Sequence, residues 1–138
     1  MATCLESTKK FFDEKGFRYE DRKDGKAIRL GIGGLKNLEG IRVSVIFDDN
    51  DRTVAVRSYE LCKIPEAKLD KLHELCSDLN AKYRWVKFYV DSEDNTITIE
   101  SDLITTPEEA GAEIFEVVGR MSVIVDQAYP DIMKALWS

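Results

Sequence analysis

The chain has 138 residues, the size of one ordinary domain with its own hydrophobic core. Acidic residues outnumber basic ones by 26 to 20, and the net charge of −6 argues against general attraction to nucleic acid or anionic membranes. No apolar run approaches the roughly 20 residues that span a bilayer, and the N-terminus lacks a signal-peptide pattern. We therefore expect a single cytoplasmic domain over residues 1–138 with no membrane partner.

The first expected elements are a helix and a β-hairpin. Thr3 and Glu6 have the spacing of a capping box, and Gly16 is a typical helix end. Two-residue alternation follows over residues 17–32, interrupted by Asp24-Gly25, which is a strong hairpin turn.

A second hairpin and a second helix come next. Residues 31–34 should loosen into a loop, after which apolar residues alternate over 41–47 and 54–56 around the acidic turn 48–51. Pro65 suits the first turn of a helix. The apolar stripe of that helix consists of Leu69, Leu72, Cys76, Leu79 and Tyr83.

The change from helical to strand spacing is sharpest at residues 79–91. One side of the resulting strand should be core and consists of Val86, Phe88 and Val90. The other side should meet water and consists of Trp85, Lys87 and Tyr89. A return strand through Ile97 and Ile99 completes a third hairpin. Two large aromatic side chains on a wet face require an explanation.

The last helix has the best start signal in the chain. Thr106 can cap it and Pro107 suits its first position. Gly111 and Gly119 lie inside its apolar stripe, and each should weaken it by up to about 1 kcal/mol. Pro130 should break or restart the helix before a short C-terminal turn.

The expected order is helix, four strands, helix, two strands, helix. Clean two-residue alternation on nearly every strand predicts a sheet with one buried face and one wetter face. The fold class is therefore α+β, with two layers in which antiparallel β-hairpins carry helices packed on one face.

The wetter face is expected to be rich in cations and aromatics. Its residues are Arg29, Arg42, Ser44, Ala55, Arg57, Trp85, Lys87, Tyr89, Thr98 and Glu100. Acidic side chains collect on the last helix instead, so the charge should be two-sided. Because arginine and aromatic residues are enriched at interface centres, we predict partner or self contact through Trp85, Lys87, Tyr89, Arg42 and Arg57.

Two structural explanations compete with this prediction. Long arginine and lysine stems can cover a solvated sheet with Trp85 and Tyr89 packed on them, or a helix can cross the face and bury the aromatics. The binding hypothesis predicts that reversing the charges of Lys87 and Arg57 weakens partner binding without unfolding the domain.

No combination of residues predicts catalysis, a metal or a cofactor. His73 and Cys76 lie three apart with Cys62 nearby, but Cys76 belongs to an apolar stripe, where a thiol is buried and protonated. Zinc would need a fourth ligand, and the chain has no second histidine. Three cysteines without framework spacing indicate reduced thiols. We expect a non-enzymatic protein with no cofactor.

Segments over nearly the whole chain carry a family resemblance. They are Phe17-Arg18-Tyr19, Arg29-Leu30-Gly31, the Val43–Asp48 strand, Ala55-Val56-Arg57-Ser58, Leu79-Asn80 through Tyr83-Arg84-Trp85 to Lys87-Phe88-Tyr89, and Asp126 through Ala128-Tyr129-Pro130 to Leu136-Trp137. Together they resemble the bacterial YbjN-like proteins, which are described as sensory transduction regulators with a fold similar to type III secretion chaperones. The resemblance implies a non-enzymatic domain that forms a homodimer and binds extended polypeptide segments. It transfers no catalytic residues.

The leading hypothesis is a non-catalytic protein-binding module, regulatory or chaperone-like, that acts as a homodimer and binds a polypeptide segment. The alternative is single-stranded nucleic-acid binding through the same basic aromatic face, with affinity that falls steeply with salt. The net charge of −6 counts against nucleic acid. A small enzyme that uses His73 is the third hypothesis.

Overall fold

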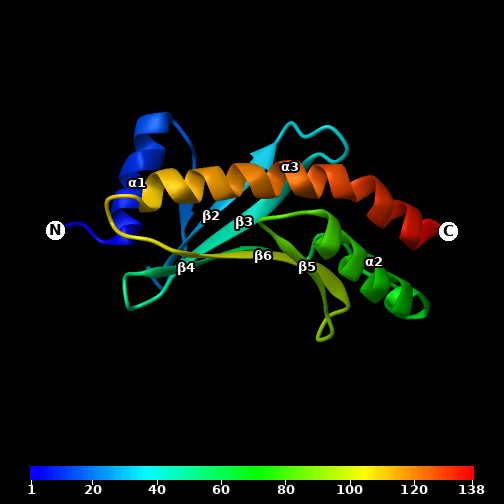
Figure 1. The fold of residues 1–138 in the computed structure, drawn as a ribbon. Helices are drawn as coiled ribbons and strands as arrows, with labels where there is room; N and C mark the ends of the chain where they lie inside the picture. Colours follow the sequence, from blue (N-terminus) through cyan, green and yellow to red (C-terminus); the bar gives the residue numbers. More distant parts are fainter.

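The computed structural model describes residues 1–138, and its elements follow in the predicted order (Figure 1). The helices are α1 (Cys4–Lys15), α2 (Leu69–Lys82) and α3 (Ala110–Trp137), and the 3-10 turn η1 (Glu66–Lys68) leads into α2. The strands are β1 (Glu20–Asp21), β2 (Ala27–Gly33), β3 (Gly40–Phe47), β4 (Thr53–Ser58), β5 (Lys87–Asp91) and β6 (Thr96–Ile104). The predicted α+β class is confirmed.

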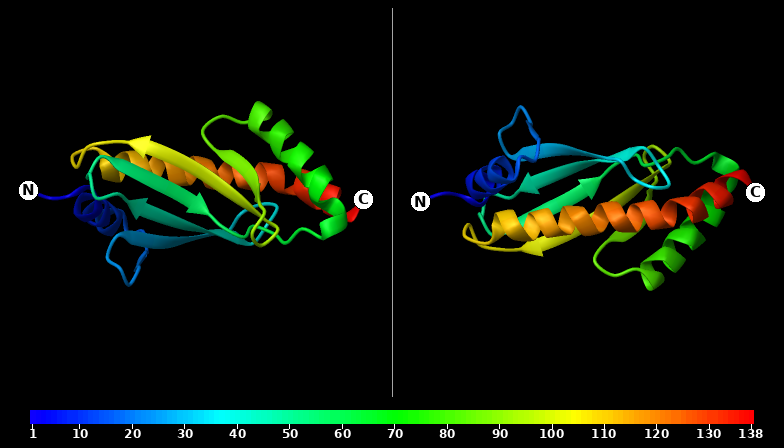
Figure 2. Two further views of the ribbon diagram at one scale, coloured as in Figure 1. Left: turned by 90° about the horizontal axis from the view of Figure 1, so that it is seen from below. Right: turned by 90° about the horizontal axis from the view of Figure 1, so that it is seen from above.

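All six strands form one antiparallel sheet in the order β1-β2-β3-β4-β6-β5. The strand β4 therefore pairs with β6, and β5 lies at one edge of the sheet. Helices α1 and α3 cover one face, and α2 packs beside β5 and α3 (Figures 1 and 2). No helix covers the opposite face, so the explanation in which a helix buries the aromatics is wrong.

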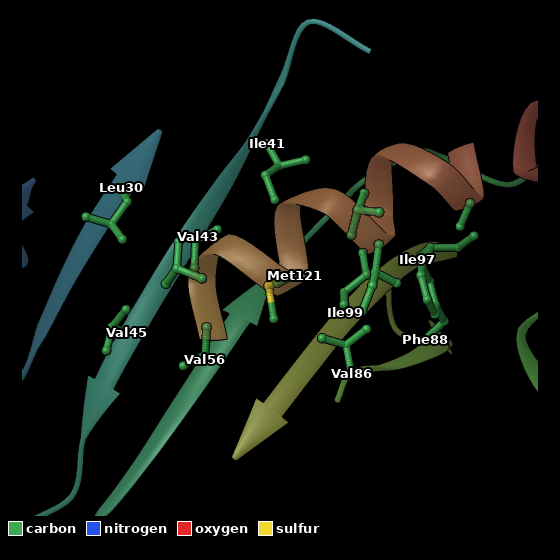
Figure 3. Packing of buried hydrophobic residues seen from close by; sticks show 14 of the residues in the cluster. Leu30, Ile41, Val43, Val45, Val56, Val86, Phe88, Ile97, Ile99 and Met121 are labelled. Atoms are coloured by element: carbon green, nitrogen blue, oxygen red, sulfur yellow. The ribbon is translucent and has the colours of Figure 1, made fainter. Parts of the chain in front are cut away.

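The core lies between the sheet and the helices (Figure 3). Alternate residues of every long strand point into it, and Met121 of α3 reaches down to the strands from above. Complete burial of a side chain of this size contributes roughly 1.5–3 kcal/mol, which strongly disfavours any one-residue slip in strand register.

The predicted capping box starts α1. The Glu6 N–H donates to Thr3 Oγ1 at 3.1 Å, and the Thr3 N–H donates to Glu6 Oε1 at 3.0 Å. Gly16 ends the helix in the left-handed conformation, with φ of 70°. Both predictions from the sequence are confirmed.

The prediction that Pro130 interrupts the last helix is wrong, because α3 continues from Ala110 to Trp137. Proline has no N–H to donate to the carbonyl four residues earlier, which belongs to Asp126. Asn37, in the β2–β3 loop, supplies the missing donor, and its Nδ2 lies 2.8 Å from that carbonyl oxygen. Ile132 and Leu136, beyond the proline, are buried, and their burial favours continuation of the helix.

The two glycines inside α3 have different surroundings. A Cβ on Gly111 would lie 2.5 Å from the Phe11 side chain, so this glycine permits α1 to pack closely on α3. A Cβ on Gly119 would meet no atom within 4 Å. Packing within the chain therefore explains Gly111 but leaves Gly119 unexplained.

Candidate functional site

The helix-free face of the sheet, here called the outer face, carries four of the five predicted contact residues. Strand pairing forms one row across it, which consists of Arg29, Ser44, Arg57, Glu100 and Lys87. Arg42 lies two residues along β3 from this row, and Tyr89 lies two residues along β5. The strands β3 and β5 are three inter-strand steps apart, about 14 Å at ordinary spacing. Arg42 therefore does not share one compact patch with Lys87 and Tyr89.

Arg57 is held in ion pairs at the centre of the outer face. Its Nη2 lies 2.9 Å from Asp102 Oδ1, and its Nε lies 3.5 Å from Glu100 Oε2. Its side chain is only 17% exposed. Reversal of its charge would bring three carboxylates together, so Arg57 serves to join β4 to β6 and is unsuitable as a probe of binding.

Trp85 does not lie on the outer face, and this part of the prediction is wrong. The strand β5 begins at Lys87, and the preceding Trp85 has a φ of 78°. The ring lies on the helix side, where the guanidinium carbons of Arg84 and Arg120 are 4.8 and 5.1 Å from its centroid. Two-residue alternation in the sequence does not predict such a change of backbone direction. The aromatic pair expected for base stacking is therefore split between two sides of the molecule.

One side chain caps the sheet edge at β5. Asn80 of α2 accepts a hydrogen bond from the Phe88 N–H at 2.7 Å and donates one to the Phe88 carbonyl at 2.9 Å. A single carboxamide thus takes the place that a neighbouring strand would occupy. Blocking of a free edge in this way protects proteins from unwanted strand pairing.

The opposite edge is open along the second half of β2. The two-residue strand β1 pairs only with Ile28 and Arg29, and no strand pairs with residues 30–33 on that side (Figure 2). This part of β2 therefore has a neighbouring strand on one side only, namely β3.

The open edge presents free backbone groups. Even-numbered residues of β2 bond to β3, as the hydrogen bond from the Phe47 N–H to the Lys26 carbonyl indicates, while the Ala27 carbonyl accepts from the β1 side. Gly31 and Gly33 therefore direct their N–H and C=O groups outward. Neither residue makes a hydrogen bond on that side. Residues 31–33 remain strand, so the predicted loop begins later than expected.

A broad hollow of about 1380 Å³ runs along this open edge. Its charged residues are Arg18, Arg22, Arg29, Arg42, Asp13, Glu20 and Glu60. Arg22 is paired with Asp24, whereas Arg18, Arg29 and Arg42 have no carboxylate within 4.0 Å. We call this region the β2-edge hollow. It combines free backbone groups with three unpaired guanidinium groups.

A second hollow, of about 780 Å³, lies between Trp85 and α3 and is here called the tryptophan hollow. It is lined by Lys82, Tyr83, Arg84, Trp85, Phe115, Glu116, Gly119, Arg120, Val123 and Ile124. Trp85 and Val123 are 56% and 53% exposed. The left-handed backbone of Trp85 costs roughly 1–3 kcal/mol, and a glycine within a helix costs roughly 0.5–1 kcal/mol relative to alanine. Two energetically unfavourable features, the left-handed backbone of Trp85 and the glycine at position 119 of α3, therefore line the same hollow.

The thiols are not poised for nucleophilic chemistry. Burial raises the pKa of Cys62 to about 11, and burial together with the nearby Cys62 raises the pKa of Cys76 to about 11. For Cys4, burial and the neighbouring Asp51 raise the pKa to about 11. All three are therefore protonated at neutral pH and are weak nucleophiles.

His73 is exposed on α2, and no carboxylate oxygen lies within 4.0 Å of its ring nitrogens. No three histidine, cysteine, aspartate or glutamate side chains come together as a metal site. None of the helices combines the length and the apolar character needed to cross a membrane.

Comparison with known families assigns the chain. The model of the YbjN family, described as "putative bacterial sensory transduction regulator", matches residues 7–131. The chain belongs to the YbjN family. The resemblance identified from the sequence is therefore confirmed. The YbjN family, to which the chain belongs, is the one described as regulatory.

A solved structure shares the YbjN fold. The crystal structure of YbjN from E. coli, described as "a putative transcription regulator", superposes with a TM-score of 0.65 over 92% of this chain and 92% of that chain. The two sequences are 18% identical, so the similarity establishes the fold alone. No curated protein matches the sequence.

The sequence of this YbjN-family chain predicts a contact role for Arg42 but gives no sign of the open edge beside it. Gly31 and Gly33 have the composition of a loop although they lie in β2, and nothing in the sequence indicates that β1 is only two residues long. The tryptophan hollow does have a signal in the sequence, because Gly119 interrupts an apolar helical stripe. A glycine within a helix predicts local weakness, however, and only the tertiary structure shows that this one lines a hollow.

Proposed function

We propose that this YbjN-family protein is a non-catalytic regulatory module that binds an extended polypeptide segment as an added strand on β2. The observation that carries the proposal is the pair of outward-facing, unbonded backbone positions at Gly31 and Gly33. An extended peptide can hydrogen-bond to such an edge through its own main chain. The family's description as a regulator supports the same class of function.

The chemistry beside the edge favours an acidic segment. Arg42 lies directly opposite Gly31 on β3, and both point to the outer face. A peptide residue paired with Gly31 would point its side chain to that face too. Because no long side chain projects from β2 at Gly31, a carboxylate can reach across this position to the unpaired Arg42 guanidinium. Charge-assisted hydrogen bonds of this kind are among the stronger ones.

The proposal also includes a homodimer, which the family resemblance implies. The outer face offers an apolar corner away from Arg42, formed by Ile46, Ala55 and the 75% exposed Ile104. Contact between two copies at this corner would leave the β2-edge hollow accessible, because the corner lies at the opposite end of β3 and β4.

A fluorescent nine-residue peptide of alternating valine and glutamate tests the strand-addition site. We expect it to bind, and we expect at least tenfold weaker binding to Arg42→Glu, because the guanidinium that attracts its carboxylates is replaced by a like charge. Gly31→Pro should weaken binding similarly, because it removes one outward N–H without removing a bond to β3. Fluorescence anisotropy gives the dissociation constants.

Matched controls give each result a clear meaning. Gly31→Ala keeps the N–H and has open space for its methyl group, so its binding should stay within twofold of wild type. Lys87→Glu reverses a charge on the same face near the other edge and should have little effect. Equal losses for Lys87→Glu and Arg42→Glu, or full binding by Gly31→Pro, would contradict the proposal. Tighter binding of a 20-nucleotide oligothymidylate than of the peptide would support the nucleic-acid alternative instead.

A further inference from the structure

We propose that the tryptophan hollow is a second docking site, which takes one large apolar side chain from an amphipathic helix of another protein. The carboxylates of that helix would meet Lys82 and Arg84 at the rim. The site uses a surface distinct from β2 and does not depend on strand addition there.

The hollow exists because α3 carries no side chain at Gly119. Phe115, Gly119 and Val123 follow one another on the same face of α3, one turn apart. Packing within the chain does not require the glycine, since a Cβ at this position would meet nothing within 4 Å. An alanine or leucine here would favour the helix. The gap therefore fits a side chain supplied from outside.

Trp85, the aromatic wall of the hollow, is held in place while it stays exposed. Trp85 has a left-handed backbone with φ of 78°, which bulky residues rarely adopt. The Ser101 hydroxyl donates to its carbonyl at 2.9 Å, and the following residue, Val86, is buried. Trp85 is nevertheless 56% exposed. Such strain commonly occurs where a residue serves recognition.

The rim of the hollow carries positive charge. Arg120 is bound to Glu116 at 2.8 Å, so these two charges compensate each other. Lys82 and Arg84 have no carboxylate within 4.0 Å, and they leave the rim positive in a chain whose net charge is −6. An apolar floor with a positive rim complements an apolar anchor flanked by acidic residues.

The same charges count against a second copy of this chain as the occupant. A two-fold contact would place the same patch on both sides of the interface. Lys82 and Arg84 of one copy would then face Lys82 and Arg84 of the other, and like charges placed opposite each other disfavour association. A partner of opposite charge avoids this repulsion.

Binding can be measured with a designed probe and the fluorescence of Trp85. Trp137 is 84% exposed, and Trp137→Phe removes the only other tryptophan. The probe is a helical 15-residue peptide with one central leucine and glutamates four residues before and after it. We expect saturable quenching or a spectral shift on titration, and at least tenfold weaker binding when the leucine is alanine or the glutamates are lysines.

Gly119→Leu in the same background is the decisive variant. The new side chain has open space, so the protein should fold with a melting temperature equal to or above that of the parent. The leucine side chain should fill the hollow and weaken binding of the glutamate peptide at least tenfold. Ala112→Leu introduces the same side chain at an exposed position of α3 outside the hollow, so it is the control and should bind normally.

The possible results are readily separated. Equal binding by parent and Gly119→Leu, equal binding of the glutamate and lysine peptides, or no binding of the glutamate peptide at millimolar concentration would each overturn the proposal. Loss of a wild-type dimer in Gly119→Leu would assign the hollow to a second copy and would also overturn it. Arg42→Glu should not affect this peptide, so failure here and failure of the β2 site are distinguishable.

Discussion

Asp126 illustrates how one side chain can organise a loop and a helix together. Its carboxylate accepts hydrogen bonds from the Lys36 N–H at 3.0 Å and the Asn37 N–H at 2.7 Å, and its carbonyl accepts one from Asn37 Nδ2. Desolvation acts to raise the pKa of Asp126, but the backbone N–H groups of Asn37, Lys36 and Leu38 lower it below its ordinary value. The β2–β3 loop is thereby fastened where Pro130 leaves a carbonyl unpaired.

At the residue scale we predict a pH-dependent effect of Asp126→Asn. Because the folded-state pKa is depressed, the carboxylate stabilises the protein fully above the ordinary aspartate pKa of 3.8 and ceases to do so as the pH falls through the lower folded value. Urea unfolding should show Asp126→Asn less stable than wild type at pH 7, with a difference that shrinks below about pH 4. A difference independent of pH would contradict this account.

At the scale of elements, the two edges of the sheet differ in how they are finished. Asn80 occupies both outward backbone groups of Phe88 on β5, whereas Gly31 and Gly33 on β2 have none of theirs occupied. Edge protection is ordinarily needed to prevent association. One edge protected and one edge open is what a module that adds one strand at a chosen place requires.

The role of Asn80 can be tested directly. Asn80→Ala should lower the free energy of unfolding by about 1–3 kcal/mol, because it leaves the N–H and C=O of Phe88 without partners. The stability of Asn80→Asp should lie between those of wild type and Asn80→Ala, since a carboxylate can accept from the Phe88 N–H but cannot donate to its carbonyl. Asp78→Ala, at an exposed position on α2, is the control. Chemical denaturation gives the free energy of unfolding of wild type and the three variants. A loss of stability in Asn80→Ala no larger than that in Asp78→Ala would show that Asn80 does not protect the edge.

At the scale of the whole molecule, the three surfaces proposed for contact are separate from one another. The β2-edge hollow and the tryptophan hollow lie on different sides of the domain, and the apolar corner around Ile104 is separate from both. A homodimer formed through this corner could therefore bind partners at the other two surfaces.

Sedimentation velocity tests the homodimer. We expect a mass twice the chain's 15.7 kDa, and we expect Ile104→Lys to shift the protein toward monomer. The side chain is 75% exposed in the single chain, so the substitution should change the stability of the fold by no more than about 0.5 kcal/mol. A monomeric wild type would refute the dimer. A dimer that Ile104→Lys leaves intact would place the interface elsewhere.

Much of this architecture was predictable because local patterns record it directly. The capping box at Thr3, the left-handed end at Gly16 and the alternating strands each depend on neighbours within a few residues. Pro130 misled at this level, because the donor that compensates for it comes from Asn37, about 90 residues away in sequence. The predicted helix start at Thr106 was wrong as well, since α3 begins at Ala110 with Glu109 as its N-cap and without a side-chain capping bond. Local rules cannot include a partner supplied by folding.

By itself, the sequence determined the order of elements and the buried face of each strand, because periodicity and local caps encode them. Its match to the family model determined membership of the YbjN family. Only the tertiary structure decided where the candidate sites lie. It turned Trp85 to the helix side, paired Arg57 with two carboxylates and left β2 open beside Gly31. These features depend on which distant segments become neighbours, and that is set by packing of the whole chain rather than by spacing along it.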